Sequence, residues 1–157
     1  MSRTRTLTGA GVIATVALVL LFGNQAVTEW VARHYPNPNS DGWSWLLHKL
    51  TWPAWAFSPG AGGPRALLVA DLRALFLILF VALILSVFGK AVSGGAFLLG
   101  WSALIFGSAL AALITAWVAS DASLIGALNA AQEGSGYGLF VGWIVGIATA
   151  TAKKPNP

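Results

Sequence analysis

Two histidines and an aspartate lie in one polar stretch and are the residues best suited to metal binding or acid–base chemistry. His34, Asp41 and His48 are close in sequence, and imidazole with carboxylate is a donor set that binds zinc or transfers protons. Their spacing matches neither an HExxH motif nor a His-x-His pair, so the signal has low specificity. We expect no metal site and no catalytic residue here. A membrane enzyme with its site at these residues is kept as a third functional hypothesis.

Motifs for cofactors and for common enzymes are missing from the sequence. The chain has no cysteine, which excludes disulfides, thiolate catalysis and cysteine metal ligands. Gly60, Gly62 and Gly63 lack the preceding strand and the lysine of a phosphate-binding loop. The basic residues stand singly or in pairs, which does not suit a nucleic-acid surface. We therefore expect no cofactor and no nucleic-acid partner.

The composition and the order of the charges indicate a membrane protein. Of the 157 residues, 57% are hydrophobic and 9% are charged, whereas a soluble domain has about 25% charged residues. One group of bases flanks the apolar runs with no acid nearby: Arg3, Arg5, Lys90, Lys153 and Lys154. The alternate gaps hold all five acids and the other bases: Glu29, Asp41, Asp71, Asp121, Glu133, Arg33, Lys49, Arg65 and Arg73. This asymmetry predicts that the first group is cytoplasmic.

Four apolar segments approach the length needed to cross a bilayer, since about 20 helical residues span a hydrocarbon core of roughly 30 Å. We expect an all-α membrane protein, a bundle of four transmembrane helices with both termini cytoplasmic, in a single domain over residues 1–157. The expected crossings are residues 7–30, 66–89, 95–119 and 134–152. An outer loop of residues 31–65 and an outer connection of residues 120–133 join them. The Ala- and Gly-rich, cysteine-free composition suggests the plasma membrane of a bacterium.

The first apolar segment has a second interpretation as a cleaved signal peptide. Arg3 and Arg5 precede an apolar run of about 13 residues, as in such a leader. Ala26 suits the position before a cut, but Asn24 is a poor small residue two positions earlier. We favour a retained helix.

The outer loop holds four of the eight tryptophans, Trp43, Trp45, Trp52 and Trp55. Tryptophan favours the headgroup layer of a membrane, where its apolar ring and its N–H are both satisfied. Asp41 as a helix cap and Pro53 as a stop predict a short helix between them. This helix either rests on the membrane or presents its rings to another protein, and we favour the first. A second short surface helix is expected after a cap at Ser120 and Asp121.

Small residues recur every four positions in the last two apolar segments. The fourth segment has Gly134, Gly138, Gly142 and Gly146, and the third has Ala103, Gly107 and Ala111, continued by Thr115. Such faces allow two helix backbones to approach closely. We expect the third and fourth helices to pack together through them inside one bundle. The alternative is a seam between subunits.

None of the charged residues lies near the middle of an expected crossing. The mid-depth hydroxyls can each bond to their own helix backbone: Thr15, Ser86, Ser102, Ser108 and Thr115. Asp71 and Arg73 come closest to membrane depth, and two residues apart on a helix they do not face one another. We expect them to brace the outer boundary by meeting partners on neighbouring helices, such as Glu29 or Arg33.

These observations favour a binding role over catalysis or transport. The leading hypothesis is a non-catalytic accessory, assembly or scaffolding subunit of a membrane complex, with the lipid bilayer and other membrane protein subunits, or a copy of itself, as partners. The alternative is a small oligomeric channel or transporter with Gly-lined helix interfaces. A transport pathway normally requires polar groups at membrane depth, and the sequence shows few of them.

Overall fold

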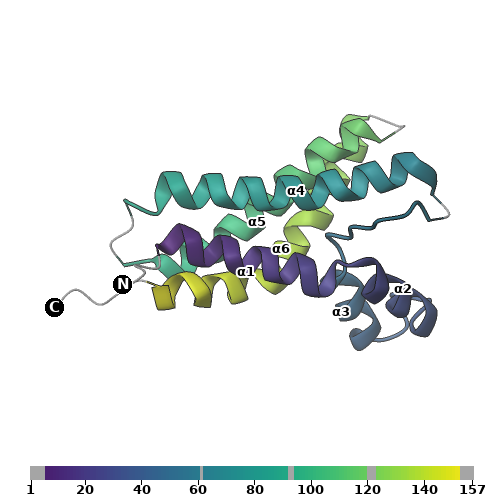
Figure 1. The fold of residues 1–157 in the computed structure, drawn as a ribbon, viewed down its shortest axis with the longest axis horizontal. Coiled ribbons are helices and arrows are strands. Elements are labelled where there is room, and N and C mark those ends of the chain that lie inside the picture. Colours follow the sequence, from purple (N-terminus) through teal and green to yellow (C-terminus); the bar gives the residue numbers. More distant parts are fainter. Residues whose placement is uncertain (1–5, 61, 92–93, 120–122, 153–157) are drawn as a thin grey trace.

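The computed structural model describes residues 6–60, 62–91, 94–119 and 123–152, which form six α-helices and no strand (Figure 1). The helices are α1 (Leu7–Phe22), α2 (Gln25–His34), α3 (Gly42–Leu50), α4 (Gly63–Phe88), α5 (Ala96–Val118) and α6 (Leu124–Ala152). Three of them, α4, α5 and α6, are long and apolar enough to cross a membrane. The chain is therefore an all-helical protein with the spans of a membrane-embedded protein. Helix α1 is apolar but only 16 residues long.

Helices α1, α4, α5 and α6 pack into one bundle, and α2 and α3 lie at one end of it (Figure 1). Helix α1 contacts α4 and α6, and α5 contacts the same two helices. Their inward faces supply a core of medium-sized side chains, among them Leu77, Val81, Leu104 and Val145. The outward face of α4 exposes Leu75, Leu79 and Leu83. In water such a face would be an association site, whereas lipid solvates it at no cost.

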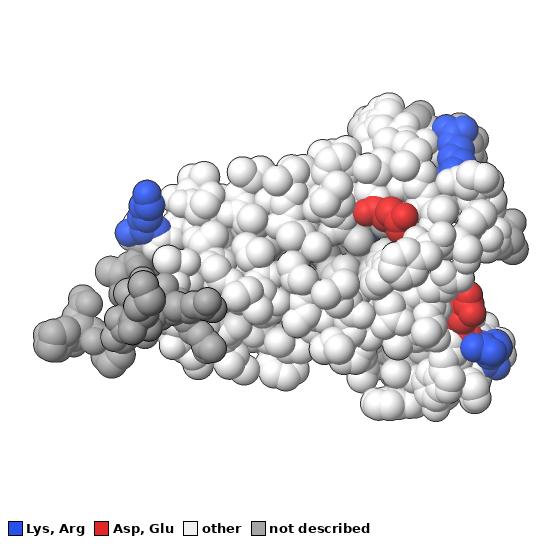
Figure 2. All heavy atoms as spheres, in the orientation of Figure 1, with Lys and Arg blue, Asp and Glu red and all other residues white. Residues whose placement is uncertain are grey.

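The two ends of the bundle differ in their charged residues and in the segments that cover them. At one end Thr8 Oγ1 donates to the carbonyl of Leu85 over 3.1 Å, and Thr149 Oγ1 donates to the carbonyl of Ala96 over 2.7 Å. Lys90 is exposed there, and we call this the Lys90 end. The other end carries α2, α3 and the chain up to Phe57, which together we call the aromatic cap (residues 25–57). Figure 2 shows a basic side chain at the left end, both signs toward the right, and uncharged surface between them.

Only some of the charged residues behind the expected asymmetry lie in the part of the chain that the structure describes. Of the five bases assigned to the cytoplasmic group, Lys90 alone lies in the described residues. Arg3, Arg5, Lys153 and Lys154, together with Asp121 of the opposite group, lie outside them.

The first expected crossing, residues 7–30, is two helices in the structure, broken at Gly23 and Asn24. Asn24 caps both of them: its Nδ2 donates to the carbonyls of Leu20 and Leu21 over 3.0 Å each, and its Oδ1 accepts from the N–H of Val27 over 3.0 Å. An asparagine that satisfies orphan groups on both sides stabilises a break that apolar length alone does not reveal.

The last helix begins ten residues earlier than expected. Residues 120–133 were expected to be an outer connection with a short surface helix, but residues 124–133 are the first turns of α6. Ser123 accepts from the N–H of Gly126 over 3.0 Å, while the expected cap at Ser120 and Asp121 lies outside the described residues. Gly134 does not end this helix, because one glycine inside a helix costs only about 1 kcal/mol. The middle helices agree with the expected bounds within three residues.

Candidate functional site

The glycines of α6 lie against the backbone of α5. A Cβ on Gly138 would meet the backbone of Ile105, and one on Gly146 would lie 2.8 Å from the carbonyl oxygen of Phe97. Gly134 and Gly142 are equally confined, by Ser108 and Trp101. Close approach therefore requires glycine along this face, and the four glycines are buried inside one chain.

The small residues of α5 are used differently from the expected pairing. The nearest neighbours of Gly107 are Val81 and Leu77, which belong to α4. The expectation that Gly107 meets the glycine face of the fourth segment is therefore wrong. Gly100 meets α6 instead, with a Cβ there placed 2.8 Å from the carbonyl oxygen of Val145. Ala103 and Ala111 are fully buried in the core beside Gly107.

The four loop tryptophans divide into three that attach the aromatic cap to the bundle and one that does not. Trp45 meets Phe140 edge-on at 4.7 Å between ring centroids, and Trp52 stacks on Tyr137 at 5.3 Å. The indole N–H of Trp55 donates to the carbonyl of Val19 over 3.0 Å. Trp43 is 57% exposed.

The backbone of the same loop completes the end of α1. The N–H of Trp55 donates to the carbonyl of Gly23 over 2.8 Å, and a Cβ on Gly23 would lie 2.5 Å from the carbonyl oxygen of Pro53. The last carbonyls of α1 thus obtain partners from the cap instead of from water.

Arg73 is half-buried beneath the aromatic cap. Its guanidinium lies 5.4 Å from the centroid of the Trp52 ring, and its Nε donates weakly to Thr115 Oγ1 on α5 over 3.4 Å. Thr115 donates its own proton to the carbonyl of Ala111 over 2.8 Å, which leaves its lone pairs for Arg73. Arg73, on α4, therefore contacts both α5 and the cap.

The other charges expected to brace the boundary meet different partners. Asp71 Oδ1 accepts from the N–H of Ala56 over 3.0 Å. On α2, Glu29 accepts from Gln25 Nε2 over 2.8 Å, and Arg33 Nε donates to the backbone carbonyl of Glu29 over 3.2 Å. Asp71 and Arg73 do reach other elements, but through Ala56, Trp52 and Thr115 and not through Glu29 or Arg33. Backbone and aromatic partners of this kind cannot be identified from charge patterns.

The three residues considered for metal binding or acid–base chemistry, His34, Asp41 and His48, each bond to their own local backbone. His34 Nδ1 lies 3.0 Å from the carbonyl of Trp30, and His48 Nδ1 lies 2.9 Å from the carbonyl of Ser44. Asp41 accepts from the N–H of Ser44 over 2.7 Å at the start of α3, which lowers the pKa of its carboxyl group. Within the described residues, no group of three His, Cys, Asp or Glu side chains is arranged to hold a metal ion.

The mid-depth hydroxyls bond to their own helix backbones, which confirms the sequence prediction. Thr15 donates to the carbonyl of Gly11, Ser86 to that of Leu83 and Ser102 to that of Leu99. Ser108 and Thr115 do the same within α5. These groups therefore leave no unsatisfied donor for a solute.

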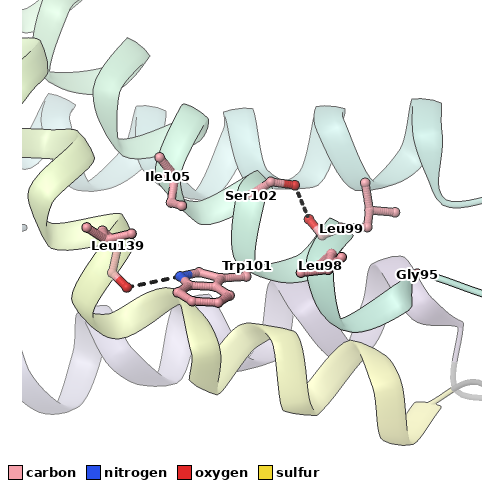
Figure 3. Close-up of a pocket in the computed structure, with 7 residues that line it drawn as sticks. All are labelled: Gly95, Leu98, Leu99, Trp101, Ser102, Ile105 and Leu139. Atoms are coloured by element: carbon pink, nitrogen blue, oxygen red, sulfur yellow. Dashed lines mark hydrogen bonds between the residues drawn. The ribbon is translucent and has the colours of Figure 1, made fainter.

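A groove in two parts follows the α5–α6 surface. The part beside the aromatic cap has a volume of about 690 Å³ and is lined by Trp45, Lys49, Ile105, Asn129, Gln132, Glu133, Ser135, Gly136, Leu139 and Phe140. The part toward the Lys90 end has about 470 Å³ and is lined by Gly95, Leu98, Leu99, Trp101, Ser102, Ile105 and Leu139 (Figure 3). Ile105 and Leu139 line both parts, so the two adjoin. We call them the polar part and the apolar part of the groove.

The walls of the apolar part have their polar atoms paired. Trp101 Nε1 donates to the carbonyl of Leu139 over 3.0 Å, and Ser102 Oγ donates to the carbonyl of Leu99 over 3.1 Å (Figure 3). What remains exposed to an occupant is hydrocarbon and the face of an indole ring. No sequence pattern indicates this site, because Trp101 lies inside an apolar segment and its partner is 38 residues away.

Comparison of the chain with protein-family models, with curated proteins and with solved structures found no match.

Proposed function

We propose that this chain is a non-catalytic subunit of a membrane complex that binds its partner through the aromatic cap. In this proposal α1 and the three long helices all cross the plasma membrane of a bacterium. The Lys90 end and both termini are cytoplasmic, and the cap lies on the outer side. The distribution of charge supports this orientation, because Lys90 stands without acids while Asp41, Asp71 and Glu133 are at the cap end.

The observation that carries the proposal is the exposure of three aromatic side chains on the cap. Trp30 is 44% exposed, Trp43 57% and Phe57 86%, although the cap is attached to the bundle by Trp45, Trp52 and Trp55. Exposed aromatic rings on a fixed segment are the residues that most often dominate the energy of a protein interface. The bilayer headgroup layer is the competing partner for the same rings.

A transport function receives less support. The glycines that would line an intersubunit seam are packed against α5 inside one chain, so a pore between subunits would need other residues. A membrane enzyme would need His34, Asp41 and His48 to act on a substrate, and each is bonded to its own local backbone.

The test is purification of the tagged chain from its own membranes in mild detergent. We expect a different polypeptide to copurify in stoichiometric amount and to be lost from the double variant Trp43→Ser and Phe57→Ser. The matched control is Trp117→Ser, which removes an exposed tryptophan of α5 and should leave the complex intact. Isolation of the chain alone, or as a closed homo-oligomer that the double variant does not alter, would contradict the proposal.

A further inference from the structure

The groove between α5 and α6 is apolar in one part and polar in the other, which suits an amphipathic ligand. Its apolar part is bounded by leucine and isoleucine side chains and the Trp101 ring, with polar atoms paired as described. Residues 95–105, which are the N-cap of α5 and its first ten residues, extend about 15 Å along the helix axis at 1.5 Å per residue. This is about half of a hydrocarbon core of roughly 30 Å. A hydrocarbon chain is therefore the occupant that this part fits.

The polar part of the groove supplies one charge of each sign. Lys49 on α3 and Glu133 on α6 both line it, together with the amides of Asn129 and Gln132. Lys49 Nζ lies 5.9 Å from the centroid of the Trp45 ring, and the ammonium retains N–H donors for an oxygen ligand. A Cβ on Gly136 would lie 3.9 Å from Lys49 Nζ, so the ammonium group lies close over α6.

We propose that this groove binds one phospholipid whose headgroup carries a phosphate and a primary amine. Lys49 binds the phosphate and Glu133 accepts hydrogen bonds from the amine. The acyl chain occupies the apolar part toward the Lys90 end. Phosphatidylglycerol offers Glu133 only neutral hydroxyl donors, whose hydrogen bonds to a carboxylate are weaker than those of an ammonium group. The quaternary amine of phosphatidylcholine cannot donate a hydrogen bond to it. The groove therefore prefers phosphatidylethanolamine over phosphatidylcholine and phosphatidylglycerol.

The site is independent of the proposed complex, because none of the three exposed cap aromatics lines the groove. The test is native mass spectrometry of the full chain in detergent after delipidation, with the three lipids added back at equal concentration and with identical acyl chains. We expect one retained phosphatidylethanolamine per chain, bound about tenfold more tightly than phosphatidylglycerol.

Three variants separate specific binding from ordinary solvation by lipid. Glu133→Gln should abolish the preference for phosphatidylethanolamine over phosphatidylglycerol. The matched control Glu29→Gln, on α2 and outside the groove, should retain it. Lys49→Gln should weaken binding of every phospholipid. Leu98→Trp, at a 64% exposed position, should fill the apolar part and weaken binding whatever the headgroup.

Two results would overturn the proposal. One is equal retention of the three lipids by the wild-type chain. The other is a headgroup preference that survives in Glu133→Gln as it does in Glu29→Gln.

Discussion

The guanidinium group of Arg73, on a membrane-length helix, lies over the indole ring of Trp52 at 5.4 Å from its centroid. The same indole stacks on Tyr137 of α6 at 5.3 Å. The Trp52 side chain thus joins α4 to α6 and places an aromatic ring against the half-buried guanidinium group of Arg73. Such a contact contributes about 0.5 to 2 kcal/mol, with the larger values where the cation is desolvated.

Replacement of this tryptophan should destabilise the bundle. We expect Trp52→Leu to lower the free energy of unfolding by about 2 kcal/mol, through lost packing and the lost cation–π contact. Thermal unfolding in detergent, followed by circular dichroism, measures the change. Trp43→Leu, at the exposed ring of the same loop, should change it by less than about 0.5 kcal/mol.

The contribution of the cation itself requires a double-mutant cycle. Trp52→Leu combined with Arg73→Met should give a coupling energy of about 0.5 to 2 kcal/mol. Additive effects of the two substitutions would show that the ring and the guanidinium group do not interact.

The glycine face gives a second test with a control on the same helix. Gly138→Ala places a Cβ against the Ile105 backbone and should destabilise the fold by about 1 to 3 kcal/mol. Gly136 has only Lys49 Nζ near it, at 3.9 Å, so Gly136→Ala should be neutral or stabilise by about 0.5 to 1 kcal/mol through the helix propensity of alanine. Equal effects in chemical or thermal unfolding would contradict the packing.

The hydrogen bond by which Asp41 caps the N-terminus of α3 should be sensitive to acid. Its pKa is lowered from 3.8, first because it accepts the Ser44 N–H and then because of Ser40 and Trp43. A carboxyl group with a lowered folded-state pKa stabilises the fold fully above its unfolded pKa of about 3.9, and that contribution is lost as the pH falls through the folded value.

The Ser44 amide resonance in NMR spectra reports this titration. We expect its midpoint below pH 3.8 in the wild type. In Asp41→Asn the titration of the Ser44 resonance should vanish while the capping hydrogen bond of α3 remains, because asparagine caps helices as well as aspartate does. A midpoint at or above the ordinary value would rule out the hydrogen bond as the dominant influence.

Apolar length and charge order predicted the all-helical class and the positions of the two middle helices. They did not predict the break at Gly23 and Asn24, because neither residue is charged and both interrupt the apolar run only briefly. The decisive contacts there come from Asn24 and from Trp55, which is 31 positions further along the chain. A capping asparagine after a glycine was the local signal that could have located the break.

Prediction of the sites was limited by the same lack of long-range information. Spacing placed the glycines on one face of α6, but both faces of α5 carry small residues, so the pairing of Gly107 with α4 was not determined. Arg73 was recognised as a charge needing a partner, and aromatic and hydroxyl partners leave no complementary charge in the sequence. The groove depends on Lys49 of α3 lying beside α6, a tertiary contact that no pattern within either helix encodes.

Sided cysteine labelling tests the proposed topology most directly, since the chain contains no cysteine of its own. Single cysteines would replace Ser2, Asn39 and Lys90, and intact cells would be treated with a membrane-impermeant maleimide. We predict that only Asn39→Cys is labelled in intact cells, and that Ser2→Cys and Lys90→Cys react only after the membrane is permeabilised. Labelling of Ser2→Cys or Lys90→Cys from outside, or protection of Asn39→Cys, would contradict a bundle of four crossings with the aromatic cap outside.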